Sequence, residues 1–240
     1  MLPYLAEFLG TAMLILLGDG VVANVNLNKS GMKGGGSIQI GIAWGLAVMV
    51  PACIFGVAGG PGGGFNPAFT ISLAVAGKCP WAMVPGYIVA QIAGACLGAI
   101  LVYLCFKDQF DATEDPATKR GVFCTAPAIP NMPRNIFQEA VATFVLVFAL
   151  FGFGNVKGAG ATGVGNLYTF GIIVACGMSL GGLTGYAMNP ARDLGPRIAH
   201  AILPIKDKTD SNWSYGLVVP IFGPIIGALA AVLLFMAIPW

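Results

Sequence analysis

The stretch Asn66-Pro67-Ala68 has an identical copy later in the chain, at Asn189-Pro190-Ala191. Asn is a strong helix N-cap, and Pro is favoured at the first helical position because its missing N–H is not needed there. Each copy is therefore expected to begin a helix. The apolar segments that follow, residues 69–77 and 194–203, are only half of the ~20 residues that a bilayer-spanning helix needs. Half-helices with polar caps at membrane depth are costly unless they line something wet, so the pair predicts a pore.

The composition indicates a membrane protein. Of the 240 residues, 57% are hydrophobic and 9% are charged, and the mean hydropathy is +0.82. Soluble domains carry roughly 25% charged residues, so these side chains could not cover a soluble surface. The net charge of +2 is too small to indicate a nucleic-acid partner.

Cysteine and histidine usage argues against a metal centre. The six cysteines form no Cys-x-x-Cys pair, and His200 is the only histidine in the chain. We therefore expect neither a zinc site nor a disulfide framework, and the cysteines are interpreted as small buried hydrophobic residues. His200 follows the second half-helix and is expected at a pore mouth or in packing. A single His without a paired nucleophile also argues against an intramembrane enzyme.

Hydropathy predicts an all-α membrane protein with six transmembrane helices and two half-helices. The full spans are expected at residues 4–23, 37–58, 82–106, 135–154, 165–183 and 215–238. The half-helices follow the second and the fifth span. The order is therefore full, full, half, full, and then the same again.

This order indicates a single domain, residues 1–240, built from two inverted repeats. Glu7 lies in the first span of one half, and Glu139 lies in the first span of the other. An odd number of spans in each half places the two copies in opposite orientations, a recurring transport architecture. The repeats are expected at about residues 1–106 and 135–240, joined by an aqueous loop at residues 107–134. The Gly-rich stretch at residues 59–64 is expected to be non-helical and to expose its carbonyls along a wet channel.

The paired strings, the two glutamates and the sequence GYAMNPARD at residues 185–193 resemble the aquaporin superfamily, also called the major intrinsic proteins. The resemblance covers essentially the whole chain. Asp193 after Asn-Pro-Ala-Arg, together with Pro220-Ile221 in the last span, is similar to the glycerol facilitator, or aquaglyceroporin, branch. Two departures stand out, since the family usually has His where this chain has Gly64, and Phe is common where it has Tyr186.

The resemblance implies a selectivity filter made of Trp44, Gly177, Tyr186 and Arg192. The two aromatic residues would form an apolar corner for the C–H edge of a polyol. Arg192 and backbone carbonyls would face its hydroxyl groups and replace hydrogen bonds lost with water. Gly177 would leave room for the carbon backbone of the solute.

Further pore groups are implied near the two half-helix tips. Asn66 and Asn189 would point amide donors at the solute, and each helix N-terminus carries about +0.5 of an elementary charge. Together with Arg192 these ends would form a barrier to cations and interrupt a proton wire. The carbonyl ladder is expected from Gly62, Gly63, Gly64 and Phe65 on one side and from Gly185, Tyr186 and Ala187 on the other.

Three acidic residues lie within predicted spans. Because each half has one broken loop to satisfy, Glu7 and Glu139 are interpreted as acceptors for loop amides; the alternative is a proton relay. Asp19 lies near the end of the first span and is expected at the interface, in contact with solvent. The resemblance places both termini in the cytoplasm, whereas the Lys and Arg residues of the loops indicate the reverse orientation.

The resemblance implies a passive channel for glycerol and other small uncharged solutes together with water, which excludes ions and protons. It implies no cofactor and no enzymatic reaction, and a homotetramer in the plasma membrane with one pore in each subunit. Dihydroxyacetone, lactic acid and urea stay open as solutes. The alternatives are a mainly water-selective channel, against which Gly177 and Asp193 argue, and a proton-coupled carrier that uses the two glutamates.

Overall fold

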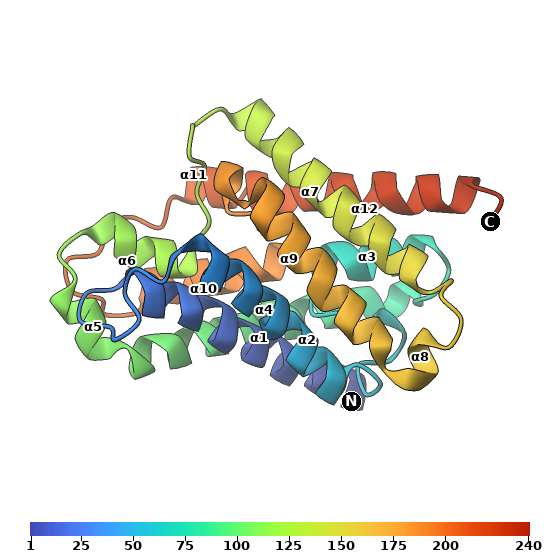
Figure 1. Cartoon of the computed structure of the whole chain (residues 1–240), viewed down its shortest axis with the longest axis horizontal. Coiled ribbons are helices and arrows are strands. Elements are labelled where there is room, and N and C mark those ends of the chain that lie inside the picture. Colours follow the sequence, from blue (N-terminus) through green and yellow to red (C-terminus); the bar gives the residue numbers. More distant parts are fainter.

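The computed structural model describes residues 1–240 and is entirely helical. Six long helices form a bundle, as predicted, and each is long and apolar enough to cross a membrane (Figure 1). They are α1 (Leu2–Asn26), α2 (Gly36–Phe55), α4 (Val84–Cys105), α7 (Met132–Phe153), α9 (Val164–Thr184) and α12 (Val219–Ala237). Short turns, η2 (Trp81–Met83) and α11 (Trp213–Gly216), precede α4 and α12.

Two short helices lie inside the bundle, α3 (Pro67–Val75) and α10 (Pro190–Ile202). The side-chain oxygen of Asn66 accepts a hydrogen bond from the Ala68 amide at 3.0 Å, and that of Asn189 accepts from the Ala191 amide at the same distance. Both Asn residues have extended backbones, and a Pro follows each of them. The prediction that each Asn-Pro-Ala copy begins a short helix is therefore confirmed.

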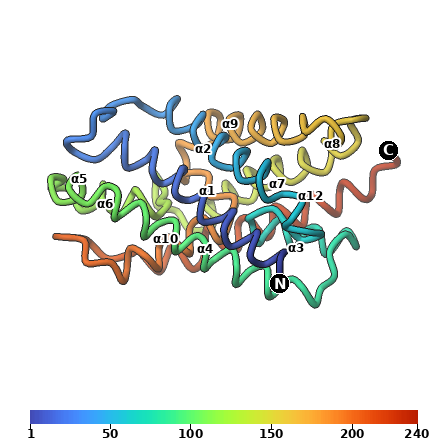
Figure 2. Tube along the Cα trace, turned by 90° about the horizontal axis from the view of Figure 1, so that it is seen from below, coloured from blue at the N-terminus to red at the C-terminus, as the bar shows by residue number.

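The two halves match element by element in how their helices pack. In the first half α1 lies against α4, and in the second α7 lies against α12, while α2 and α9 pack against each other. The half-helices are exchanged: α3 packs against α12, and α10 packs against α4. In Figure 2, α10 lies beside α4 and α3 lies close to α12. This arrangement brings the two half-helices together inside the bundle.

Glycines allow the closest of these helix contacts, a recurring device in membrane bundles. A Cβ on Gly98 of α4 would lie 2.8 Å from the Ile15 side chain of α1, and one on Gly227 of α12 would lie 2.9 Å from the Phe144 amide of α7. Such distances are too short for real Cβ atoms, so a side chain at either position would push the helices apart.

The connector between the halves is more ordered than the predicted loop. It contains α5 (Lys107–Ala112) and α6 (Pro116–Phe123). Asp115 caps α6, and the Thr118 hydroxyl and the Ala117 and Thr118 amides hold the pKa of Asp115 below its usual value. The apolar side chain of Phe123 is fully buried. The charged residues of this segment led to the prediction of a loop, but the Asp115 cap and the buried apolar side chains stabilise α6.

A second expectation was also wrong. The Gly-rich stretch before α3 contains one 3₁₀ turn, η1 (Gly60–Gly62), with Pro61 near its start.

A further short helix, α8 (Ala159–Thr162), lies between α7 and α9. Both chain termini lie toward the same end of the molecule as α8, and α5, α6 and α11 lie toward the other end (Figure 1).

Candidate pore and its constriction

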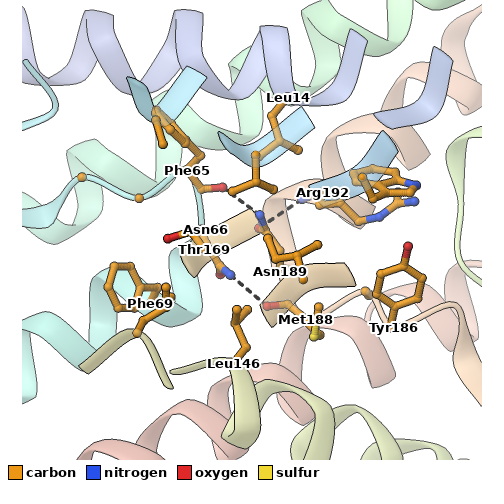
Figure 3. A pocket seen from close by; sticks show the side chains of 18 of the residues that line it. Leu14, Phe65, Asn66, Phe69, Leu146, Thr169, Tyr186, Met188, Asn189 and Arg192 are labelled. Atoms are coloured by element: carbon orange, nitrogen blue, oxygen red, sulfur yellow. Dashed lines mark hydrogen bonds between the residues drawn. The ribbon is translucent and has the colours of Figure 1, made fainter. Parts of the chain in front are cut away.

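The two half-helix tips are linked by reciprocal hydrogen bonds. The Asn66 side-chain nitrogen donates to the Met188 carbonyl at 2.8 Å, and the Asn189 nitrogen donates to the Phe65 carbonyl at 2.7 Å (Figure 3). One N–H of each amide is therefore directed at the facing loop. The sequence interpretation had instead assigned these donors to the solute. An amide carries two N–H groups, and both Asn residues also line the cavity described below, so each retains a second donor.

The two accepting residues have unusual backbones. Phe65 has a φ of 55° and Met188 a φ of 49°, in the left-handed region that residues other than Gly rarely adopt. Each is the residue directly before its Asn. Such a conformation costs about 1–2 kcal/mol and persists only where the surroundings fix it.

Two buried glutamates fix these loops. The Glu7 carboxylate accepts from the Gly64 amide at 2.9 Å and the Phe65 amide at 2.8 Å. The Glu139 carboxylate accepts from the amides of Ala187 and Met188, both at 2.9 Å. Neither glutamate has any exposed surface.

A polar side chain completes each carboxylate site. The Gln91 side-chain amide donates to Glu7 at 2.7 Å, and the Thr184 hydroxyl donates to Glu139 at 2.6 Å. Each carboxylate therefore meets two backbone amides and one side-chain donor. Neither glutamate lines the cavity.

A cavity of about 280 Å³ runs past the linked tips. Its wall combines polar groups of both loops with apolar side chains from the long helices, including Leu14, Val48, Leu146, Leu150 and Ile173. Tyr186 and Arg192 lie toward one end of the view in Figure 3, and Phe69 lies toward the other. The arrangement is an amphipathic passage rather than a uniformly polar or apolar one.

Most of the predicted carbonyl set lies on this cavity. The lining includes Gly63, Gly64, Phe65, Gly185, Tyr186 and Ala187. Gly62 is not among the lining residues, and its carbonyl accepts a hydrogen bond from the Thr70 hydroxyl at 2.8 Å. Met188, which the sequence interpretation did not single out, lines the cavity with its neighbours. Pro67, Ala68, Pro190 and Ala191 are buried and form the first turns of the half-helices.

Gly177 contacts another member of the predicted filter. A Cβ at Gly177 would lie 2.9 Å from Cζ of Tyr186, and one at Gly181 would lie 2.7 Å from Cδ1 of the same ring. The space that Gly177 leaves is therefore filled by the Tyr186 ring, and this glycine does not itself line the cavity. The absence of a side chain at Gly177 therefore determines where the Tyr186 ring can lie.

Arg192 and Trp44 lie against each other. The guanidinium carbon is 4.0 Å from the centre of the Trp44 ring, within the range of a cation–π contact. Both residues line the cavity, although Trp44 is only 5% exposed and Arg192 only 8% exposed. The four predicted filter residues therefore form two contacting pairs, Gly177 with Tyr186 and Trp44 with Arg192.

Asp19 is the residue that the sequence interpretation placed wrongly. It is fully buried, and its Oδ1 lies 3.3 Å from Nη1 of Arg192. The same Nη1 donates to the Phe123 carbonyl at 3.3 Å. A carboxylate within an apolar span is itself a signal of function, and that signal pointed to Asp19. The prediction of solvent contact was wrong because Asp19 faces the inside of the bundle.

Asp193 forms a second buried pair next to the first. Its carboxylate lies 2.7 Å from Nη2 of Arg197, and it accepts hydrogen bonds from the Thr125 amide and hydroxyl. Asp193 is fully buried and does not line the cavity. His200 is also fully buried, with Nδ1 at 2.8 Å from the Ser211 hydroxyl, so it lies in packing.

Six spanning helices around two half-helices that meet tip to tip beside an internal cavity define a membrane channel with its pore inside one chain. A family model described as "Major intrinsic protein" matches residues 2–235. The chain belongs to the major intrinsic protein family.

Two named relatives illustrate the range of similarity. The chain is 52% identical over 226 residues to a probable glycerol uptake facilitator protein of Thermotoga maritima, covering 94% of each chain. It is 41% identical over 231 residues to a D/L-lactic acid transporter of Lactiplantibacillus plantarum, covering 95% of this chain and 93% of the relative.

The fold also matches a solved structure. The aquaglyceroporin from Plasmodium falciparum superposes with a TM-score of 0.82 at 28% sequence identity. The match covers 97% of this chain and 93% of that one.

Proposed function

We propose that this chain is a passive channel for glycerol and other small uncharged solutes, with water passing alongside. The observation that carries the proposal is the mixed wall of the cavity, where loop carbonyls and Asn amides share the lining with Leu and Ile side chains. A polyol has one hydroxylated side and one C–H side, and such a wall offers partners to both. The relative named as a probable glycerol uptake facilitator protein supports the same solute.

The narrow part of the pore is assigned to Trp44, Tyr186 and Arg192. The Trp44 ring and the Tyr186 ring supply apolar surface, and the guanidinium supplies N–H donors for hydroxyl groups. Gly177 belongs to this unit because it determines where the Tyr186 ring lies.

Exclusion of ions and protons is assigned to the linked tips. The N-termini of α3 and α10 approach each other there, each with a partial positive charge. Asn66 and Asn189 keep one free N–H each, and a water that accepts from both cannot pass a proton along a continuous chain. Cations meet an unfavourable field at the same place.

The contacts of Glu7 and Glu139 favour a channel over a proton-coupled carrier. Each carboxylate is fully buried away from the cavity and accepts three hydrogen bonds. Protonating either group in each transport cycle would remove acceptors from amides that lie in a loop of strained backbone. Both glutamates are therefore assigned to loop support.

Undissociated lactic acid is a further candidate solute. A relative at 41% identity is named for D/L-lactic acid, and the neutral acid carries hydroxyl and carbonyl groups beside a methyl group. We assign the protein to the plasma membrane as a homotetramer, with the apolar outer faces of the six long helices turned to lipid or to neighbouring subunits.

Stopped-flow light scattering on vesicles that contain the protein tests the proposal. We expect fast glycerol flux that rises in proportion to the concentration gradient and does not respond to an imposed proton gradient. Protein-free vesicles and vesicles given sorbitol are the controls. Glycerol rates equal to those of protein-free vesicles would contradict the channel, and uptake that follows the proton gradient would instead support the carrier.

A further inference from the structure

We propose that Asp19 is a positioning residue of the constriction, which holds Arg192 in place and cancels its charge. The inference rests on the proposed function of Arg192 in the narrow part of the pore. Asp19 lies on α1, outside the cavity lining and behind the arginine. Its effect on solutes would therefore pass entirely through Arg192.

The hydrogen bonds of Arg192 divide its donors into two groups. Nη1 donates to Asp19 Oδ1 and to the Phe123 carbonyl, both at 3.3 Å. Neither Nε nor Nη2 donates a hydrogen bond to the protein, and the residue lines the cavity. One end of the guanidinium is thus anchored, and the remaining N–H groups are left for solute hydroxyls.

The neighbour of Asp19 seats the other side of the constriction. A Cβ on Gly18 would lie 2.7 Å from Cε3 of Trp44, closer than real Cβ atoms come. The indole in turn lies 4.0 Å from the guanidinium carbon. The dipeptide Gly18-Asp19 of α1 therefore supports both Trp44 and Arg192.

Charge is the second part of the inference. Asp19 has no exposed surface, and an ion pair out of water is hardly screened. The adjacent Asp193–Arg197 pair is also fully buried and balanced. Each of these two arginines thus has its own buried carboxylate partner. A solute meets the N–H donors of Arg192 without a net positive charge that would hold a small anion.

Removal of the carboxylate is expected to expose that charge. In Asp19→Asn, Arg192 keeps its donors but loses its counter-ion, so chloride should bind in the constriction and obstruct glycerol. We measure glycerol flux in sodium chloride and in sodium gluconate, an anion too bulky to enter. Wild-type flux should be equal in the two salts, whereas in Asp19→Asn the chloride value should fall at least about fivefold. Asp210→Asn, which removes an exposed carboxylate paired with Arg120, should behave like the wild type.

A double-mutant cycle separates this role from simple packing. If Asp19 acts through the arginine, Asp19→Asn should have no further effect on the chloride ratio when it is added to Arg192→Gln. An Asp19→Asn ratio equal to that of the wild type would overturn the proposal. An equal loss in the wild-type and Arg192→Gln backgrounds would overturn it as well.

The outcome is also decisive if Asp19→Asn does not fold. An unpaired buried cation is the expected cause, and the neutral pair Asp19→Asn with Arg192→Gln should then be recovered from membranes. Failure of the double variant would instead indicate a packing role and overturn the proposal. Osmotic water flux is recorded in the same salts. If the wild-type protein conducts water but no glycerol, the proposed solute is refuted. The chloride test of Asp19 can then still be read from the water flux.

Discussion

The side-chain nitrogen of Asn66 lies 2.8 Å from the carbonyl oxygen of Met188, a residue 122 positions further along the chain. The oxygen of the same side chain caps α3 through the Ala68 amide. A single amide group therefore both begins one half-helix and attaches it to the opposite half. The cap uses the oxygen of the amide and the link uses its nitrogen, so a substitution can separate the two tasks.

Asn66→Asp tests this double role. The carboxylate keeps the cap on Ala68 but loses the donor and places a negative charge against the Met188 carbonyl. We expect a stability loss of about 1–3 kcal/mol from the unmade hydrogen bond and an increased leak of cations. Thermal unfolding in detergent, followed with a thiol-reactive dye, reports exposure of the buried thiols of Cys79, Cys124 and Cys176. Asn155→Asp, at an exposed turn, is the control and should not change the transition.

Glu139→Gln tests the support of the second loop. The amide can accept fewer hydrogen bonds than the carboxylate, and its NH₂ group would face the backbone amide of either Ala187 or Met188. Leaving a buried donor unsatisfied costs about 1–3 kcal/mol, so both the unfolding temperature and the glycerol flux should fall. Glu114→Gln, at an exposed position, is the matched control. A Glu139→Gln protein with unchanged stability but no flux would instead indicate a direct role in transport.

Gly177→Ala tests how the constriction is shaped. The added methyl group would lie 2.9 Å from Cζ of Tyr186, so the ring must move. We expect glycerol flux to fall several-fold more than water flux, because a displaced ring narrows the passage for the larger solute. Gly182→Ala on the same helix is the control, since its Cβ would meet no atom within 4 Å. Equal losses of the two fluxes would show that position 177 does not act on selectivity.

Asp193→Asn tests the buried ion pair with Arg197. The substitution leaves a buried guanidinium without its counter-ion, and breaking such a pair costs about 3–5 kcal/mol. The Lys107–Asp111 pair has the same i, i+4 spacing but lies at the surface, where ion pairs contribute little, so Asp111→Asn should leave the stability nearly unchanged. Chemical or thermal unfolding of the two variants gives the comparison. Similar losses in both would contradict the buried role of Asp193.

The sequence predicted the helical architecture well because hydropathy and capping act locally. The predicted span at residues 4–23 lies within α1 (Leu2–Asn26). The predicted span at residues 135–154 nearly coincides with α7 (Met132–Phe153). The half-helices were found from Asn and Pro alone, since the cap is made by neighbouring residues. The connector helices were missed because their apolar faces are buried only against other parts of the fold.

The site residues were harder to place because their roles depend on contacts between distant segments. Gly177 was predicted to leave room for the solute, but the structure places the Tyr186 ring over it. Asp19 was assigned to solvent because nothing in the local sequence indicates which residue it faces across the bundle. The left-handed backbones of Phe65 and Met188 could not be predicted from the sequence either, since neither Phe nor Met favours a positive φ.

The exchange of α3 and α10 between the halves has a consequence for how the protein is made. The main packing partner of α3 is α12, which is synthesised after all the other helices of the structure. Until that helix has entered the bilayer, the first half-helix lacks the main surface on which it rests. Seating of the first half-helix is therefore a late event in biogenesis, and a nascent chain stopped before residue 219 should not hold α3 in its final position.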